Sequence, residues 1–290
     1  MRTFQIITDS AMDLTPALVE ETKVDVLPLV LTIEEKDYLN YPDEREITCT
    51  DFYNRMRGGA VGTTAACSVG KFEETFRAYA KEGKDVLYLG FSSGLSATWH
   101  NGHLAAKTVM EEYPERKILT VDSLCASMGG ALFVYLVAKK ADEGADIETV
   151  HAYATDLVQH ICHTFTVEDL VYLKRGGRVS AATALVGGLL NIKPVLHVDS
   201  EGHLVSIGKT RGRKASIAAL SNYIKGRELP ETPEVAYICH GDCIEDAQLL
   251  SDLIQKEYGF KKVVIGYTGP VIGAHSGPGT LALFFVGGNR

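Results

Sequence analysis

The chain has no long apolar run and no run of basic residues, and these two absences exclude several classes of protein. No apolar stretch reaches the roughly 18 to 20 residues that span a bilayer. The 29 Lys and Arg residues are outnumbered by 37 Asp and Glu residues, which gives a formal net charge of −8. A negative surface repels phosphate backbones and anionic lipids. We therefore expect no nucleic acid partner and at most transient contact with a membrane.

Signals for export and for metal binding are also missing. The first ten residues lack the basic, apolar and small-residue order of a secretory signal, so we expect a cytoplasmic protein. Six cysteines are dispersed over a chain long enough to fold without disulfides, which predicts reduced thiols. Cys239-His240-x-x-Cys243 has the form of half a metal site, but no second Cys or His pair has matching spacing. We predict no bound metal.

Strand and helix patterns indicate an α/β protein with two domains. Up to about residue 160, short apolar runs alternate with helical patterns, which is typical of βαβ units and a mainly parallel sheet. Residues 194–197 and 204–208 then flank a turn of sequence Asp-Ser-Glu-Gly, which predicts an antiparallel hairpin. We predict a Rossmann-like α/β domain over residues 1–160 and an α+β domain with a mainly antiparallel sheet over residues 161–290. With no low-complexity linker between them, the domains should share a cleft.

Three local patterns carry further predictions. Residues 36–48 are polar and turn-like, and residues 180–190 read as a helix whose apolar part, 182–190, lines an apolar interior or forms ordinary core. Residues 273–279 are too rich in glycine and proline for regular structure, which predicts a loop that points His275 into the cleft. An imidazole there donates to a carboxylate, and a pKa near neutrality would let it respond to a change in charge.

Hydroxyl and acidic side chains follow several predicted strands. Thr8-Asp9-Ser10, Ser92-Ser93 and Asp122-Ser123 each precede a helix or turn, and Thr63-Thr64 forms a fourth such turn. In open parallel sheets, ligands bind beyond the carboxyl ends of the strands, where helix N-termini offer free N–H groups to an anion. Any one of these turns alone is better explained as a helix cap. The four together favour an anion site.

The absence of nucleotide-binding motifs limits which anion the site would bind. No Gly-x-x-x-x-Gly-Lys-Ser/Thr loop is present, and no Gly-x-Gly-x-x-Gly follows the first strand. A nucleotide cofactor therefore has no local support, and a carboxylate becomes the better candidate. We predict no cofactor.

A serine hydrolase is the alternative function. Gly90-Phe91-Ser92-Ser93-Gly94 fits Gly-x-Ser-x-Gly between a strand and a helix, the setting of a nucleophile elbow with Ser92 as nucleophile. Asp199 or Asp242 with His275 would complete a triad in the hydrolase chain order. The usual upstream His-Gly-Gly oxyanion motif is absent.

Two basic segments stand out on the acidic chain. Lys174-Arg175-Gly176-Gly177-Arg178 surrounds a glycine turn, and residues 209–214 read Lys-Thr-Arg-Gly-Arg-Lys. Such segments are commonly solvated faces, but on this background they are also candidates for docking an acidic partner or receiving phosphate.

Six short motifs occur in order along the chain: Thr8-Asp9-Ser10, Ser92-Ser93-Gly94-Leu95-Ser96, Asp122-Ser123, Gly176-Gly177-Arg178, Leu190-Asn191-Ile192-Lys193-Pro194 and His275-Ser276-Gly277-Pro278-Gly279. Together they resemble the motifs of the DegV family of bacterial fatty-acid-binding proteins, which includes the FakB subunits of fatty acid kinase. One family motif differs, because the usual Thr-Ser-Gln-Pro reads Thr64-Ala65-Ala66-Cys67 here.

The resemblance implies a two-domain carrier that holds one long-chain fatty acid in an apolar tunnel between its domains. It implies that Thr63 and Ser93 hold the carboxylate, that His275 lies close by, and that Thr64 and Ser92 support them.

It also implies that the chain is not the catalyst. A separate ATP-dependent fatty acid kinase would phosphorylate the bound carboxylate to an acyl phosphate for lipid synthesis. Arg178 and Arg211 match positions that present the ligand to that kinase.

Overall fold

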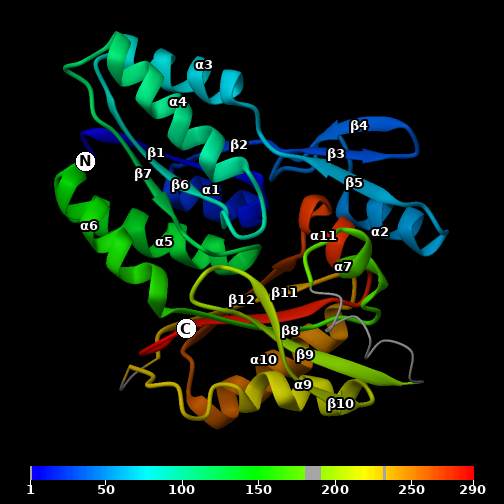
Figure 1. Ribbon diagram of the computed structural model, residues 1–290. Helices are drawn as coiled ribbons and strands as arrows, with labels where there is room; N and C mark the ends of the chain where they lie inside the picture. Colours follow the sequence, from blue (N-terminus) through cyan, green and yellow to red (C-terminus); the bar gives the residue numbers. More distant parts are fainter. Residues whose placement is uncertain (1, 180–190, 231–232) are drawn as a thin grey trace.

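The computed structural model describes residues 2–179, 191–230 and 233–290, whose strands form three sheets (Figure 1). The helix expected over residues 180–190 lies outside the described residues. Figure 1 shows the two larger sheets stacked with a layer of helices between them. No helix among the described residues is both long and apolar enough to cross a membrane.

The N-terminal sheet is parallel, as the alternating pattern predicts. Its strand order is β2-β1-β6-β7. Helices α3 and α4 cover one face, and α5 and α6 lie on the other (Figure 1). The elements are β1 (Phe4–Asp9), η1 (Ser10–Met12), α1 (Pro16–Thr22), β2 (Asp25–Leu27), α3 (Val69–Lys81), β6 (Asp85–Gly90), α4 (Thr98–Glu112), β7 (Ile118–Asp122), α5 (Met128–Asp142), α6 (Ile147–Leu157) and η2 (Val158–His160).

The C-terminal sheet has the order β10-β9-β8-β13-β11-β12 and is antiparallel except for the parallel pair β11 and β12. The predicted hairpin is confirmed, because β9 and β10 pair antiparallel across the turn at residues 199–203. Helices α9 and α10 cover the outer face (Figure 1). The elements are β8 (Ile161–Thr166), α7 (Val171–Arg175), β9 (Ile192–Val198), β10 (Leu204–Arg211), α9 (Arg213–Asn222), β11 (Val235–His240), α10 (Ile244–Tyr258), β12 (Lys262–Tyr267), α11 (Pro270–Ser276) and β13 (Leu281–Val286).

A third, small antiparallel sheet was not predicted. It has the order β4-β3-β5, with β3 at Val30–Ile33, β4 at Lys36–Leu39 and β5 at Gly62–Ala65, and α2 (Cys49–Arg57) packs nearby. The prediction that residues 36–48 are turn-like is wrong for β4. The two glutamates between β3 and β4 both have positive φ, as a tight hairpin turn requires, and Tyr38 of β4 is buried.

Helix α5 is the element that joins the two larger sheets. It is apolar on nearly every side, which is typical of a helix buried all round. It contacts strands β8, β11 and β13 below and helix η1 above. One continuous core cluster extends from Phe4 of the parallel sheet to Phe284 of the six-stranded sheet. The domain boundary near residue 160 therefore stays a prediction, because the core does not divide there.

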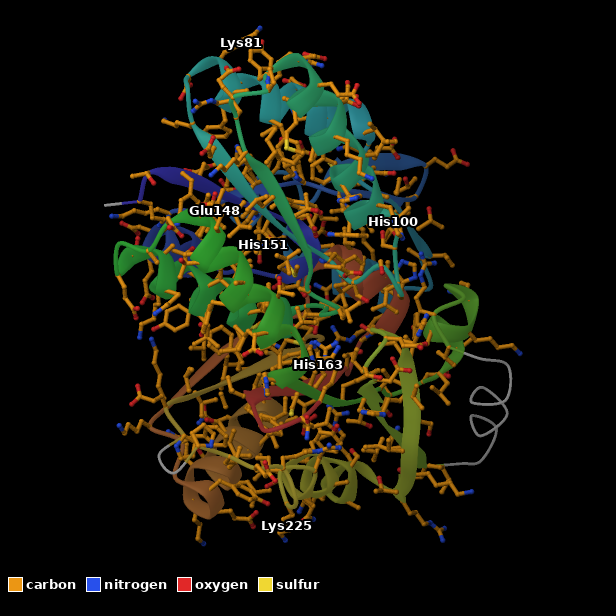
Figure 2. All side chains as sticks on the ribbon, turned by 60° about the vertical axis from the view of Figure 1, so that its left-hand side comes forward. Lys81, His100, Glu148, His151, His163 and Lys225 are labelled. Carbon is orange, nitrogen blue, oxygen red and sulfur yellow. The ribbon has the colours of Figure 1, made fainter. Side chains whose placement is uncertain are left out.

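Two adjacent glycines allow this close packing. A methyl group at Gly129 would overlap the ring of His163 on β8, and one at Gly130 would overlap the sulfur of Met12. Figure 2 places His163 between the helix layer and the six-stranded sheet. Both neighbours are at most 1% exposed, so neither can swing away into solvent.

We expect Gly130→Ala to lower the free energy of unfolding by about 1 to 3 kcal/mol, because overpacking a closed core forces side chains off their rotamers. Gly70→Ala is the matched control: Gly70 also lies in the first turn of a helix, but no atom would meet its new methyl group. That control should be neutral or stabilising. Urea denaturation measures both, and equal effects of the two substitutions would contradict the packing argument.

Candidate functional site

A cavity of about 260 Å³ lies where the three sheets meet. Phe91 and Leu95, which follow β6, and Ala126, which follows β7, line it at the carboxyl ends of the parallel strands. Phe165 of β8 and Val198 of β9 close it from the six-stranded sheet. Ligands of parallel sheets bind at this edge. The wall is mostly apolar, which suits a hydrocarbon.

The polar end of the cavity is built by Thr64, His275 and Arg178. Thr64 Oγ1 lies 2.8 Å from Nε2 of His275, and both residues line the cavity. Strand β5 places Thr64 opposite Leu31 of β3, and α11 places His275. The Arg178 guanidinium donates from Nε to the Leu95 carbonyl at 3.2 Å. Among the described lining residues, Arg178 alone carries a permanent positive charge.

The prediction of an irregular loop around His275 is wrong. Residues 270–276 form α11, a short helix with Pro270 in its first turn, where the fixed φ of proline suits a helix. Gly277, at φ +82°, ends it. Gly277, Pro278 and Gly279 therefore lie after the end of the helix and do not interrupt it. His275 still faces the cavity, as predicted, from the last turn.

His275 is neutral at physiological pH. Burial, with a further contribution from the positive charge of Arg178, lowers its pKa to about 4. The prediction of a pKa near neutrality is therefore wrong. Gly176 packs so closely on the ring that a methyl group there would overlap Nδ1, which has no hydrogen-bond partner among the described residues. His275 thus acts as a neutral hydrogen-bonding group, and Arg178 supplies the charge.

Most residues of the hydroxyl-rich turns bond to the protein itself. Thr8 Oγ1 donates to the Leu89 carbonyl at 2.7 Å, and Ser123 Oγ donates to the Gly90 carbonyl at 2.7 Å. The Asp9 carboxylate accepts from Tyr88 and from the N–H of Phe91, both at 2.9 Å. Burial raises the pKa of Asp9 to about 6. These side chains fix the loop after β6. Of the three, Asp9 alone also caps a helix, because its carboxylate accepts from the Ala11 N–H at the start of η1.

Three of the predicted carboxylate ligands do not line the cavity. Thr63 alternates with Thr64 along β5 and is exposed. Ser93 is half-buried and donates its backbone N–H to Asp122 at 3.2 Å. Ser92 is fully buried, and its Oγ donates to the Gly202 carbonyl at 2.9 Å. Of the predicted carboxylate ligands, Thr64 and His275 come together, and they are joined at the cavity by Arg178, which the resemblance implies for presentation to the kinase.

The geometry gives the hydrolase alternative no support. Ser92 Oγ is directed at the backbone of the β9–β10 turn, while the His275 imidazole bonds to Thr64 instead. Asp242 pairs with Arg57, and Asp199 accepts from backbone N–H groups of its own turn. None of these groups forms a nucleophile, base and acid chain.

Ser96 is a lining residue that the sequence reasoning missed. It lies in the Ser-Ser-Gly-Leu-Ser motif and lines the cavity beside Leu95, with its Oγ 2.9 Å from Thr98 Oγ1. The motif was the only signal, and spacing alone did not tell which of its three serines turns inward.

The remaining candidates lie apart from the polar end. Arg211 is exposed at the end of β10. Cys239 Sγ lies 3.0 Å from Thr268 Oγ1, whereas Cys243 Sγ lies 3.3 Å from Arg213. In the part of the chain that the structure describes, no three His, Cys, Asp or Glu side chains are grouped to hold a metal.

We expect the His275 ring to stay neutral from pH 8 down to pH 5 and to titrate near its lowered pKa of about 4. Because the unfolded chain takes up this proton at higher pH than the folded chain, His275 stabilises the fold above its ordinary pKa, and that stability is lost as the pH falls toward 4. NMR titration of the ring Hε1 signal, assigned through its loss in His275→Gln, measures this. A midpoint above pH 6 would refute the buried neutral state.

Comparison with known proteins identifies a family with which this chain shares its sequence over nearly its whole length. Residues 3–287 match the model of the family described as "Uncharacterised protein, DegV family". A DegV domain-containing protein of Clostridium perfringens is 38% identical over 290 residues, covering 100% of this chain and 99% of that one.

Solved structures agree over the whole chain. A DegV family protein of Thermus thermophilus, described for its fatty acid binding, is 31% identical with a TM-score of 0.85, covering 99% of this chain and 100% of that one. A DegV lipid-binding protein of Thermotoga maritima is 30% identical with a TM-score of 0.86, covering 100% of both chains. This chain therefore belongs to the DegV family.

Proposed function

We propose that the chain binds one long-chain fatty acid in the cavity, with the carboxylate at Thr64, His275 and Arg178. The observation that carries this proposal is an apolar cavity whose described wall holds one permanent charge, that of Arg178. The relatives from Thermus thermophilus and Thermotoga maritima, described as binding fatty acid and lipid, support it. Residues that precede and residues that follow position 160 in the sequence both line the cavity, which fits a ligand held between two domains.

The energetics divide between the two ends of the ligand. Each buried methylene contributes about 0.8 kcal/mol, so the acyl chain supplies most of the affinity. A carboxylate in this apolar site requires a paired charge and hydrogen bonds. Arg178 provides the charge. With Nε2–H of the neutral His275 donating to Thr64 Oγ1, the Thr64 hydroxyl is free to donate its hydrogen to the carboxylate. Ser92 supports the site indirectly by holding the β9–β10 turn against the loop after β6.

We propose further that a separate ATP-dependent kinase acts on the bound acid. The γ-phosphoryl group of ATP would pass to a carboxylate oxygen, with ADP as leaving group, to give an acyl phosphate. Support comes from the sequence, which has no Walker loop of its own and no Gly-x-Gly-x-x-Gly after its first strand. The exposed Arg211 and its basic neighbours fit the docking of an acidic partner surface.

The test of the carrier function is mass spectrometry of the organic extract of purified protein. We expect about one equivalent of a long-chain fatty acid. Arg178→Gln should weaken binding of palmitate about tenfold or more, because a charged hydrogen bond is lost, and should leave binding of methyl palmitate unchanged. Displacement of a fluorescent fatty acid measures both ligands.

Arg211→Gln is the matched control, since Arg211 is exposed and does not line the cavity. It should bind both ligands like the wild type. Equal loss of acid and ester binding in Arg178→Gln would contradict the assigned carboxylate site. Absence of fatty acid from the extract, followed by failed reloading, would overturn the carrier function.

Arg211→Gln is expected to slow acyl phosphate formation by a bacterial fatty acid kinase at least several-fold, through a raised KM for the loaded carrier. A rim charge acts mainly on association, so fatty acid binding itself should not change. Formation of acyl hydroxamate from the product measures the rate. An unchanged KM would remove Arg211 from the kinase-facing surface.

A further inference from the structure

Strand β10 forms an open edge of the six-stranded sheet. It stands at one end of the strand order and pairs with β9 alone among the described strands. Five of its eight residues are exposed, including the apolar Val205 and Ile207. The strand at the other end of the same sheet, β12, has a single exposed residue. An exposed edge strand presents unpaired N–H and C=O groups to which another strand can bond.

The register of β9 and β10 indicates which of these backbone groups are free. Gly212 donates its N–H to the Asn191 carbonyl at 2.9 Å, so it faces β9. Lys209 lies opposite Pro194, which has no N–H to give. In an antiparallel pair, alternate residues bond to the neighbouring strand. The N–H and C=O groups of Lys209 and Arg211 therefore point away from β9, out of the open edge.

The same two residues carry positive charge that is free to bind a partner. Lys209 and Arg211 are both exposed, and because they are two residues apart their side chains lie on one face of the strand. The basic side chains of Lys193 and Arg213 each pair with a carboxylate. Among the described residues, Lys209 and Arg211 form no such ion pair. The free backbone groups and the free charges therefore belong to one short segment, residues 208–211.

This segment presents its charges on the face of the sheet that closes the cavity. Lys209 lies directly opposite Pro194 of β9, and residues in that position share a face. Pro194 and Val198 are four residues apart on β9, so they also share a face, and Val198 lines the cavity. A partner strand on this edge would thus lie beside the cavity wall.

The charge determines which kind of strand fits. Two copies of this edge would bring like charges together, which is destabilising. The bulge between Ser206 and Gly208 interrupts the other half of the strand, and bulges and basic residues are features that protect an edge from pairing with itself. A strand with Asp or Glu at alternate positions instead meets an opposite charge at both Lys209 and Arg211.

We propose that residues 208–211 of β10 receive an extended acidic segment of a partner protein, which adds to the six-stranded sheet as a further strand. This inference rests on the proposed kinase partnership and names the contact by which the kinase would recognise the carrier. Backbone hydrogen bonds hold a strand added in this way, and its alternate side chains determine specificity.

The first experiment measures amide hydrogen exchange in the palmitate-loaded protein, alone and with a bacterial fatty acid kinase, at single-residue resolution. We expect the N–H groups of Lys209 and Arg211 to exchange about tenfold or more slowly in the complex, because they gain hydrogen-bond acceptors. The amides of β7, an edge strand of the parallel sheet, are the internal control and should exchange as in the free protein.

Two substitutions at one position separate charge from backbone. Lys209→Gln removes the charge and keeps the N–H, whereas Lys209→Pro removes both, and proline is tolerated on an edge strand. We expect the KM of the kinase for the loaded carrier to rise several-fold with glutamine and about tenfold further with proline, while palmitate affinity stays that of the wild type. Lys81→Gln is the matched charge control, because Lys81 is exposed on α3, far from the six-stranded sheet (Figure 2).

The outcomes separate this inference from the proposed function. Turnover of the loaded carrier with unchanged exchange at Lys209 and Arg211 would overturn the strand contact and leave the kinase partnership standing. Equal KM values for Lys209→Pro and Lys209→Gln would do the same, since the backbone would then play no part. Absence of acyl phosphate from the loaded wild type would overturn the kinase partnership and the inference together.

Discussion

The close approach of two sheets to a single helix determines this structure. Helix α5 lies between the parallel sheet and the six-stranded sheet (Figure 1). Gly129 lets its backbone approach His163 of β8, and Gly130 lets it approach Met12 of η1, which follows β1. Protein interiors are packed as densely as organic crystals, so this contact fixes the position of each sheet relative to the helix. The cavity begins where α5 begins, since Ala126 and Ser127 line it.

The polar end of the site depends on that placement through a series of buried hydrogen bonds. Asp9 fixes the loop after β6, and this loop presents the Leu95 carbonyl to Arg178. On the opposite side, β5 and α11 bring Thr64 and His275 within hydrogen-bonding distance. Charge and neutral hydrogen bonding are therefore supplied by different side chains, because burial prevents the imidazole from taking a proton.

The sequence predicted those features that local chemistry controls. Alternating strands and helices gave the parallel sheet, and the Asp-Ser-Glu-Gly turn gave the β9–β10 hairpin. It did not predict β4, whose pairing with β3 is set by burial of Tyr38 rather than by polarity. The prediction of a loop in place of α11 was wrong for a related reason. Proline in the first turn of a helix and glycine just after its last turn are compatible with a helix, and the buried residues between them favour one.

The site was predicted in part for a similar reason. The motifs named the correct segments, but a strand sends alternate side chains to opposite faces, and this separates Thr64 from Thr63. The inward serine of the Ser-Ser-Gly-Leu-Ser motif is Ser96, which depends on the path of the loop and not on residue type. The pKa of His275 depends on Gly176 and Arg178, which lie about a hundred residues earlier in the chain.

The close contacts at Gly129 and Gly130 of α5 also limit the width of the cavity. Because Met12 and His163 pack directly on the helix, spreading the two sheets to admit a wider ligand would break these buried contacts and leave a void. Room for additional carbons must be found along the axis of the cavity. The packing around α5 therefore limits the width of the ligand. Branched or ring-bearing hydrocarbons are disfavoured, whereas unbranched chains of different lengths are accepted.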